Sequence, residues 1–246
     1  MQELDSFEDA LIERFKQHPV LADIGRLSAD DFAAVLLQRR FLSLAFTPAY
    51  DLAIDLLRDE VGVRIARVIL REEYPDNNGH TRSHREDMKE DILRLGVSWK
   101  DLAESRPTPA TADTVNRTLG LIADAGSHPD SDLRLLTILR FWGEVLVSVE
   151  YGRLWQRMAP QLTLNGRNRS RFYYPHHIHD AKAHSLAAVS RLSTTHSDQL
   201  GLRLSELLTR EESAAACFRE VEQAALQLKL DFYDQFVPML SPVEAG

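Results

Sequence analysis

Apolar residues recur at steps of three and four along nearly the whole chain, and this spacing most constrains the fold. The segment DDFAAVLLQRRFLSLAF shows it clearly, with Phe32, Val35 and Leu36 on one stripe of a helix. No segment combines sustained alternation with β-branched residues, which strands require. We therefore expect an all-α protein without a sheet.

The segments that fit this helical period are separated by short polar breaks. Residues 74–83 and 162–170 contain Pro, Asn and Gly, which are typical of turns. Neither break is long enough for a domain linker. We expect a single domain over residues 1–246, built as a helical bundle. The predicted helices are 2–17, 29–58, 60–73, 83–94, 110–125, 131–158, 172–193, 198–208 and 210–240.

The segment FYYPHHIHDAKAHS, residues 172–185, holds four of the nine histidines of the chain. On a helix over 172–193, the side chains of His177, Asp180 and His184 lie within roughly 60° of one another. His176 forms a looser alternative set with Asp180 and His184, whereas His179 points elsewhere. Imidazoles and a carboxylate on one helical face suit a non-heme iron or manganese ion. The alternative is that these histidines are solvated.

A metal inside a bundle also needs carboxylates from other helices. Glu150 lies among apolar residues in FWGEVLVSVEYGRLW, where an unpaired carboxylate is costly, and Glu144 is its competitor. Glu72 and Glu73 end the apolar run RVILREE, and His84 opens the next predicted helix. Solvated helix faces or charged helix ends are the alternatives for these carboxylates.

The segment HPVLADIGRLSADDFAAVLLQRRFLSLAFTPAYDLAI, residues 18–54, resembles the opening of the heme-oxygenase-like superfamily. Two further features match that group. His84 precedes Leu95-Gly96-Val97 by eleven residues, and the histidine segment is similar to its aromatic-x-x-His-x-x-x-Asp-x-x-His helix. The resemblance covers roughly residues 15–190. It implies a heme-oxygenase-like multi-helix bundle with seven core helices.

The ligand pattern is similar to that of the diiron oxidases and oxygenases within this superfamily. The resemblance implies metal ligands at Glu73, His84, Glu150, His177, Asp180 and His184, with Glu72 as an alternative to Glu73. The position of the aspartate departs from the family pattern, because Ala181 stands where the family has Asp and Asp180 comes one residue early.

This resemblance implies an enzyme with two Fe(II) ions and O₂ as co-substrate. Relatives carry out desaturation, N-oxygenation or C–C cleavage, and we expect a small amino-acid-like or carboxylate substrate in specialised metabolism. Arg39, Arg40 and Arg153 are candidates to bind a substrate carboxylate, because guanidinium binds it bidentately. The fold also makes a homodimer plausible.

A metal-independent enzyme or a small-molecule-binding protein of the same fold is the alternative function. A thiaminase-like enzyme needs a cysteine nucleophile, and the one cysteine, Cys217, lies in a late helix where packing is the usual role. An oxidase that acts on a quinone cofactor shares the fold but needs no full carboxylate set. A purely structural helical protein is a third possibility.

Composition excludes several other classes of function. The formal net charge is −8 and no block of Lys or Arg stands out, so we expect no nucleic-acid partner. The sequence contains no run of about 18 apolar residues, so we expect no membrane span. The single cysteine excludes a disulfide framework, and the acidic start MQELDSFEDALIERF is unlike a secretory signal. We expect a cytoplasmic protein.

Overall fold

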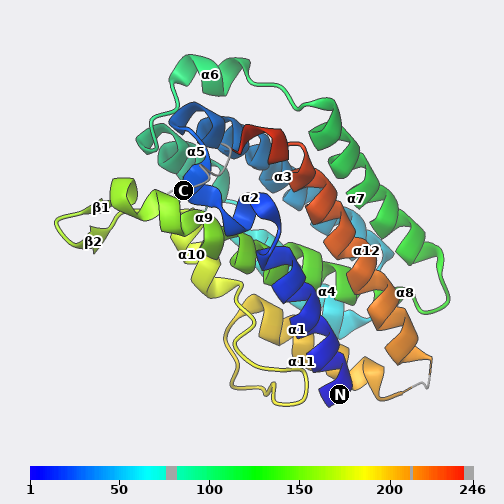
Figure 1. Cartoon of the computed structure of the whole chain (residues 1–246). Coiled ribbons are helices and arrows are strands. Elements are labelled where there is room, and N and C mark those ends of the chain that lie inside the picture. Colours follow the sequence, from blue (N-terminus) through cyan, green and yellow to red (C-terminus); the bar gives the residue numbers. More distant parts are fainter. Residues whose placement is uncertain (76–81, 211–212, 241–246) are drawn as a thin grey trace, which may run out of the picture.

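The computed structural model describes residues 1–75, 82–210 and 213–240, which form a bundle of helices (Figure 1). Residues 76–81 of the predicted turn 74–83 lie outside this description. The α-helices are α1 (Gln2–Lys16), α2 (Pro19–Ala22), α3 (Ala29–Leu56), α4 (Glu60–Glu72), α5 (His84–Arg94), α6 (Trp99–Glu104), α7 (Pro109–Ser127), α8 (Ser131–Ile138), α9 (Leu146–Leu162), α10 (Tyr173–His179), α11 (His196–Leu208) and α12 (Ala214–Asp234). Short 3₁₀ turns occur at Ile24–Arg26 (η1) and Val237–Met239 (η3).

One long helix runs through the centre of the bundle. It consists of α8, a π-helical segment η2 (Leu139–Val145) and α9, without a break between them. Every residue of η2 is buried, as expected for a helix covered on all sides. Helix α12 packs against α8 and η2, while α11 and α10 cover η2 and α9 respectively. This central helix positions the residues of the candidate site.

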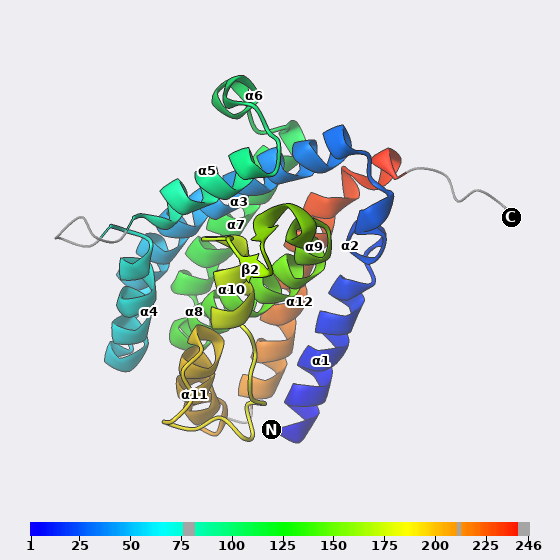
Figure 2. The same cartoon turned by 90° about the vertical axis from the view of Figure 1, so that its left-hand side faces the viewer.

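The remaining helices surround this centre. Helix α3 packs against α7 and α4, and α1 packs against α12 and α9. Figure 2 shows α4 and α1 on opposite sides of the molecule, with α9, α10 and α12 between them. Buried residues from all these elements form one hydrophobic cluster. Among the described residues, no helix combines the length and apolar character needed to cross a membrane.

The all-α prediction is confirmed, but the expectation of no sheet was wrong, because one two-stranded sheet is present. Thr163–Leu164 (β1) and Arg167–Asn168 (β2) form a small antiparallel hairpin at the end of α9. Asn165 and Gly166 connect them with positive φ angles of 51° and 71°. An Asn-Gly pair favours this two-residue turn, because both positions require the left-handed region.

The predicted helix over 172–193 was also wrong in its length, because α10 ends at His179. Its start is held by Asp91, whose carboxylate accepts bonds from the backbone N–H groups of Arg171 and Phe172. Beyond Asp180 the chain takes an irregular path to α11. There the backbone N–H of Leu186 donates to Asp5 of α1 over 2.5 Å, so a tertiary bond replaces helical ones.

Candidate metal centre

A cavity of about 160 Å³ lies between the central helix and the helices packed around it. Four carboxylates and four imidazoles line it, together with apolar side chains. Three groups of these residues each place their ligand atoms within 4.8 Å of one another. The eight residues are Glu72, Glu73, His84, Glu144, His176, His179, Asp180 and His196.

The first group contains two imidazoles and one carboxylate. Nδ1 of His84 lies 2.9 Å from Oε1 of Glu73, and the His84 and His176 rings are 4.6 Å apart. His84 is placed by the capping box of Ser83 and Glu86 at the start of α5. Nδ1 of His176 bonds to the carbonyl of Phe172 over 2.7 Å, which orients the ring and directs Nε2 away from its own helix. Two imidazoles and a carboxylate are the ligands typical of non-heme Fe(II) oxygenases.

The second group is buried and carries two carboxylates. Nδ1 of His196 lies 3.4 Å from Oε2 of Glu144 and 3.5 Å from Oδ1 of Asp180. Glu144 comes from η2 and also accepts a hydrogen bond from the hydroxyl of Tyr50. Asp180 follows the last residue of α10, and His196 is the first residue of α11. Three separate elements thus bring these side chains together.

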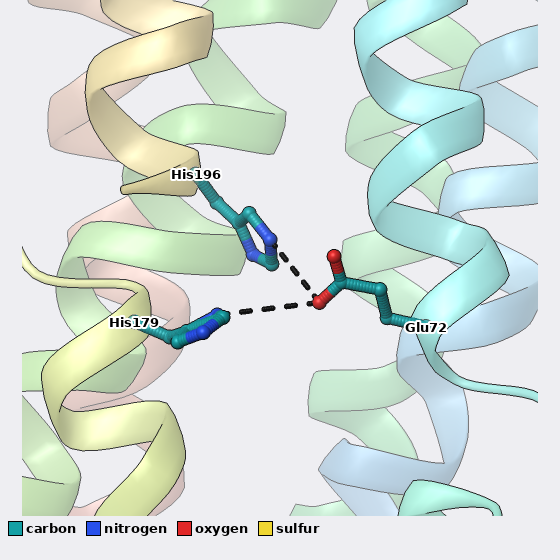
Figure 3. Close-up of side chains that lie close together, drawn as sticks. All are labelled: Glu72, His179 and His196. Atoms are coloured by element: carbon teal, nitrogen blue, oxygen red, sulfur yellow. Dashed lines mark ion pairs between the residues drawn. The ribbon is translucent and has the colours of Figure 1, made fainter. Parts of the chain in front are cut away.

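The third group shares His196 with the second and lies nearer the surface. Nε2 of His196 is 3.3 Å from Oε2 of Glu72, and Nδ1 of His179 is 4.0 Å from the same oxygen. Figure 3 shows the two rings directed at Glu72 from the opposite side of the cavity. One nitrogen of His196 therefore faces each group, so this residue joins the two.

The acidic character of the second group changes the proton affinity of its members. Burial, reinforced by repulsion from Glu144, raises the pKa of Asp180 well above its ordinary value. Burial alone would lower the pKa of His196, but Asp180, Glu144 and Glu72 outweigh it and raise that pKa to about 12. The imidazolium of His196 is thus a positive charge that faces these carboxylates.

The donor set fits two divalent cations. With all four carboxylates ionised, as metal binding requires, their four negative charges would balance two ions of charge +2. Oxygen and imidazole donors from several helices are also what diiron carboxylate sites in bundles present. Burying such carboxylates without a compensating cation is costly. The residues therefore suit a pair of iron or manganese ions.

Three of the six predicted ligands lie in these groups, namely Glu73, His84 and Asp180. Asp180 lines the cavity, whereas the backbone carbonyl of Ala181 accepts a bond from Ser197. The structure also brings in Glu72, the alternative to Glu73. Whether any of them binds a metal stays a prediction.

The structure places Glu150 outside all three groups. It is fully buried and pairs with Arg39 at 2.6 Å and with Lys229 at 3.2 Å, while Tyr233 donates to it as well. Burial would raise its pKa, but Arg39 and Lys229 lower it below its ordinary value. Burial also lowers the pKa of Lys229, to about 8. Glu144, the competitor in the sequence, lines the cavity in its place.

His177 and His184 are also outside the groups. His177 lies against α9, where its Nδ1 bonds to the carbonyl of Ser148 over 3.0 Å. His184 is half-exposed beyond the end of α10 and pairs with Asp198 at 2.5 Å. The single-face argument placed both on a continuous helix, and α10 is too short to carry His184.

Sequence reasoning missed His196 and gave His176 and His179 minor roles. His196 lies outside the histidine segment, and we expected its helix to begin at residue 198. The signal for an earlier start was Thr195, whose hydroxyl accepts a bond from the Asp198 N–H as the N-cap. That cap makes His196 the first helical residue.

Comparisons with known proteins agree on the fold. No family model and no curated protein matches the sequence. A TenA family transcription regulator from Silicibacter sp. TM1040 is 14% identical, with a TM-score of 0.59 over 98% of this chain and 96% of its own. A domain of unknown function with a heme oxygenase-like fold from Shewanella denitrificans OS217 is 16% identical, with a TM-score of 0.65 over 96% and 89%.

A third similar structure is a CADD-like protein of unknown function from Nostoc punctiforme PCC 73102. It is 13% identical, with a TM-score of 0.64 over 98% of this chain and all of its own. At these identities the likeness defines the fold and not the activity. The chain has the heme oxygenase-like fold.

Proposed function

We propose that this protein is a non-heme diiron enzyme that uses O₂ to oxidise a small organic substrate, an oxidase or oxygenase. The observation that carries the proposal is the set of four carboxylates and four imidazoles around one cavity. One ion would be held by Glu73, His84 and His176. The other would be held by Glu144, Asp180 and His196, with Glu72 and His179 beside it.

When bound, two Fe(II) ions would supply two of the four electrons that reduce O₂, and the substrate would supply the other two as it is oxidised. The side chains of this chain contribute orientation and exclusion of water. The carbonyl of Phe172 fixes His176, and the Tyr50 hydroxyl fixes Glu144 through hydrogen bonds. Apolar side chains, among them Phe46 and Val147, line the rest of the cavity and limit its water content.

The test is the iron content of each chain after anaerobic loading with Fe(II), followed by O₂ consumption. We expect two irons per chain in the parent and about one in His176→Ala. Loss of an outer-shell partner of a metal site already lowers affinity about 10–100-fold, so loss of a ligand should do more. His177→Ala is the matched control, because it removes the neighbouring imidazole outside the groups.

Two results would contradict this assignment. Equal iron loss in the His177→Ala and His176→Ala variants would mean that α10 presents a different face. An absence of iron in the parent would favour a metal-independent function of the same fold. One observation favours that second candidate: the positive charge of a protonated His196 would itself compensate the charge of Glu72, Glu144 and Asp180, which it faces at 3.3 to 3.5 Å.

A further inference from the structure

The end of the cavity formed by α3 and α12 carries an excess of positive charge. Arg39 and Lys229 both line the cavity and both pair with the single carboxylate of Glu150. All three side chains are at most 3% exposed. Two cations and one anion give this buried cluster a net charge of +1 among the residues that the structure describes. Such a charge is costly in a protein interior unless a counter-ion compensates it.

Hydrogen-bond donors are also in excess at this end of the cavity. Arg39 donates to Glu150 through Nε and to Ser43 through Nη1, yet a guanidinium has five N–H groups. Lys229 carries three N–H groups and lies 5.4 Å from the centre of the Trp142 ring. Nε1 of Trp142 is buried and has no hydrogen-bond partner in the described part of the chain, although Trp142 lines the same cavity. An anion with two acceptor oxygens would use these donors.

The cavity also limits the size and position of such an anion. Its volume of about 160 Å³ is close to that of an engineered cavity of roughly 150 Å³ that binds benzene. Tyr151 lies close to both ends, with its ring 4.9 Å from the guanidinium of Arg39 and 6.1 Å from the ring of His176. One aromatic ring therefore adjoins both the cationic end and a candidate metal ligand.

We propose that Arg39 and Lys229 form a carboxylate-binding subsite, which selects small monocarboxylates with a compact apolar body. This inference rests on the proposed function, because it takes the cavity as the place of reaction. The carboxylate would bind the two cations and leave the apolar body beside Tyr151. The carbon atoms remote from the carboxylate would then face the histidine and carboxylate groups.

The test is binding of benzoate, butyrate and hexanoate, each compared with its neutral amide, by titration calorimetry. Chelator-treated, metal-free protein is used, so that a carboxylate cannot bind through iron. Lys229→Met removes the surplus charge and leaves Arg39 paired with Glu150. Lys229→Arg keeps the charge, and Lys100→Met at an exposed position controls for the change in net charge.

We expect at least one carboxylate to bind the parent, Lys229→Arg and Lys100→Met proteins with similar affinity. The matching amide and the Lys229→Met protein should each show at least about tenfold weaker binding, since a hydrogen bond to a charged group is lost. Equal binding of carboxylate and amide, or unchanged binding by Lys229→Met, would overturn the subsite. So would a parent protein that binds none of the three acids.

Iron content separates this result from a failure of the proposed function. The Lys229→Met protein should load as much Fe(II) as the parent, because Lys229 lies outside the three ligand groups. Carboxylate binding without iron would retain the subsite and reject the diiron enzyme. Iron loading without carboxylate binding would reject the subsite and leave the diiron enzyme standing.

Discussion

Gly152 of α9 lies directly against His177 of α10. A Cβ atom at this position would lie 2.6 Å from Cε1 and 2.8 Å from Nδ1 of His177. The ring is not free to move, because Nδ1 bonds to the Ser148 carbonyl and the Ser148 hydroxyl donates to the His177 carbonyl over 2.6 Å. We therefore predict that Gly152→Ala destabilises the protein and displaces α10.

The magnitude follows from three opposing contributions. Replacing a helical glycine with alanine gains about 0.5–1 kcal/mol. Overpacking costs about 1–3 kcal/mol, and loss of the His177 hydrogen bond costs about 0.5–1.5 kcal/mol. The net expectation is a loss of about 0.5–4 kcal/mol. Gly120 of α7 is the control, because a Cβ there meets nothing within 4 Å and Gly120→Ala should gain about 0.5–1 kcal/mol.

Urea unfolding followed by circular dichroism measures both changes in the free energy of unfolding. The double variant Gly152→Ala/His177→Ala should recover stability relative to the sum of its single variants, because the clash is removed. Displacement of α10 should also weaken iron binding in Gly152→Ala. The reasoning is refuted if Gly152→Ala is as stabilising as Gly120→Ala, or if the two substitutions prove additive.

Three further predictions concern other parts of the fold. Burial and repulsion by Glu8 raise the pKa of Glu222 well above its ordinary 4.5. The folded state thus keeps a proton that the unfolded state releases above pH 4.5, so this group lowers stability as pH rises from there towards the folded pKa. Glu222→Gln should flatten that fall in a pH series of urea unfolding, and an unchanged slope would exclude Glu222 as its cause. Ser83→Ala should lower the free energy of unfolding by about 0.5–2 kcal/mol through loss of the α5 cap. A melting temperature equal to that of the parent would show that the cap is dispensable. Asp5→Ala removes the acceptor of the Leu186 N–H, so hydrogen exchange of the backbone around Leu186 should speed up while α12 stays protected.

The sequence did not determine which face of the central helix borders the cavity. In a regular α-helix Glu144 and Glu150 are roughly 120° apart, so only one of them can face the cavity. The apolar residues around both are alike, because the central helix is almost wholly buried from Leu139 to Tyr151. The π-helical segment at Glu144 and the cations beside Glu150 settled the matter, and neither leaves a periodic signal in the sequence.

The sequence by itself determined the helical class, and it offered Glu73, His84 and Asp180, which the structure places in the three groups. These depend on local periodicity and on helix ends with strong caps, which short stretches of chain encode. Only the tertiary structure replaced His177 and His184 with His176, His179 and His196. The end of α10 and the path to α11 are set by bonds to distant residues such as Asp5 and Asp91, and those contacts exist only once the helices have packed.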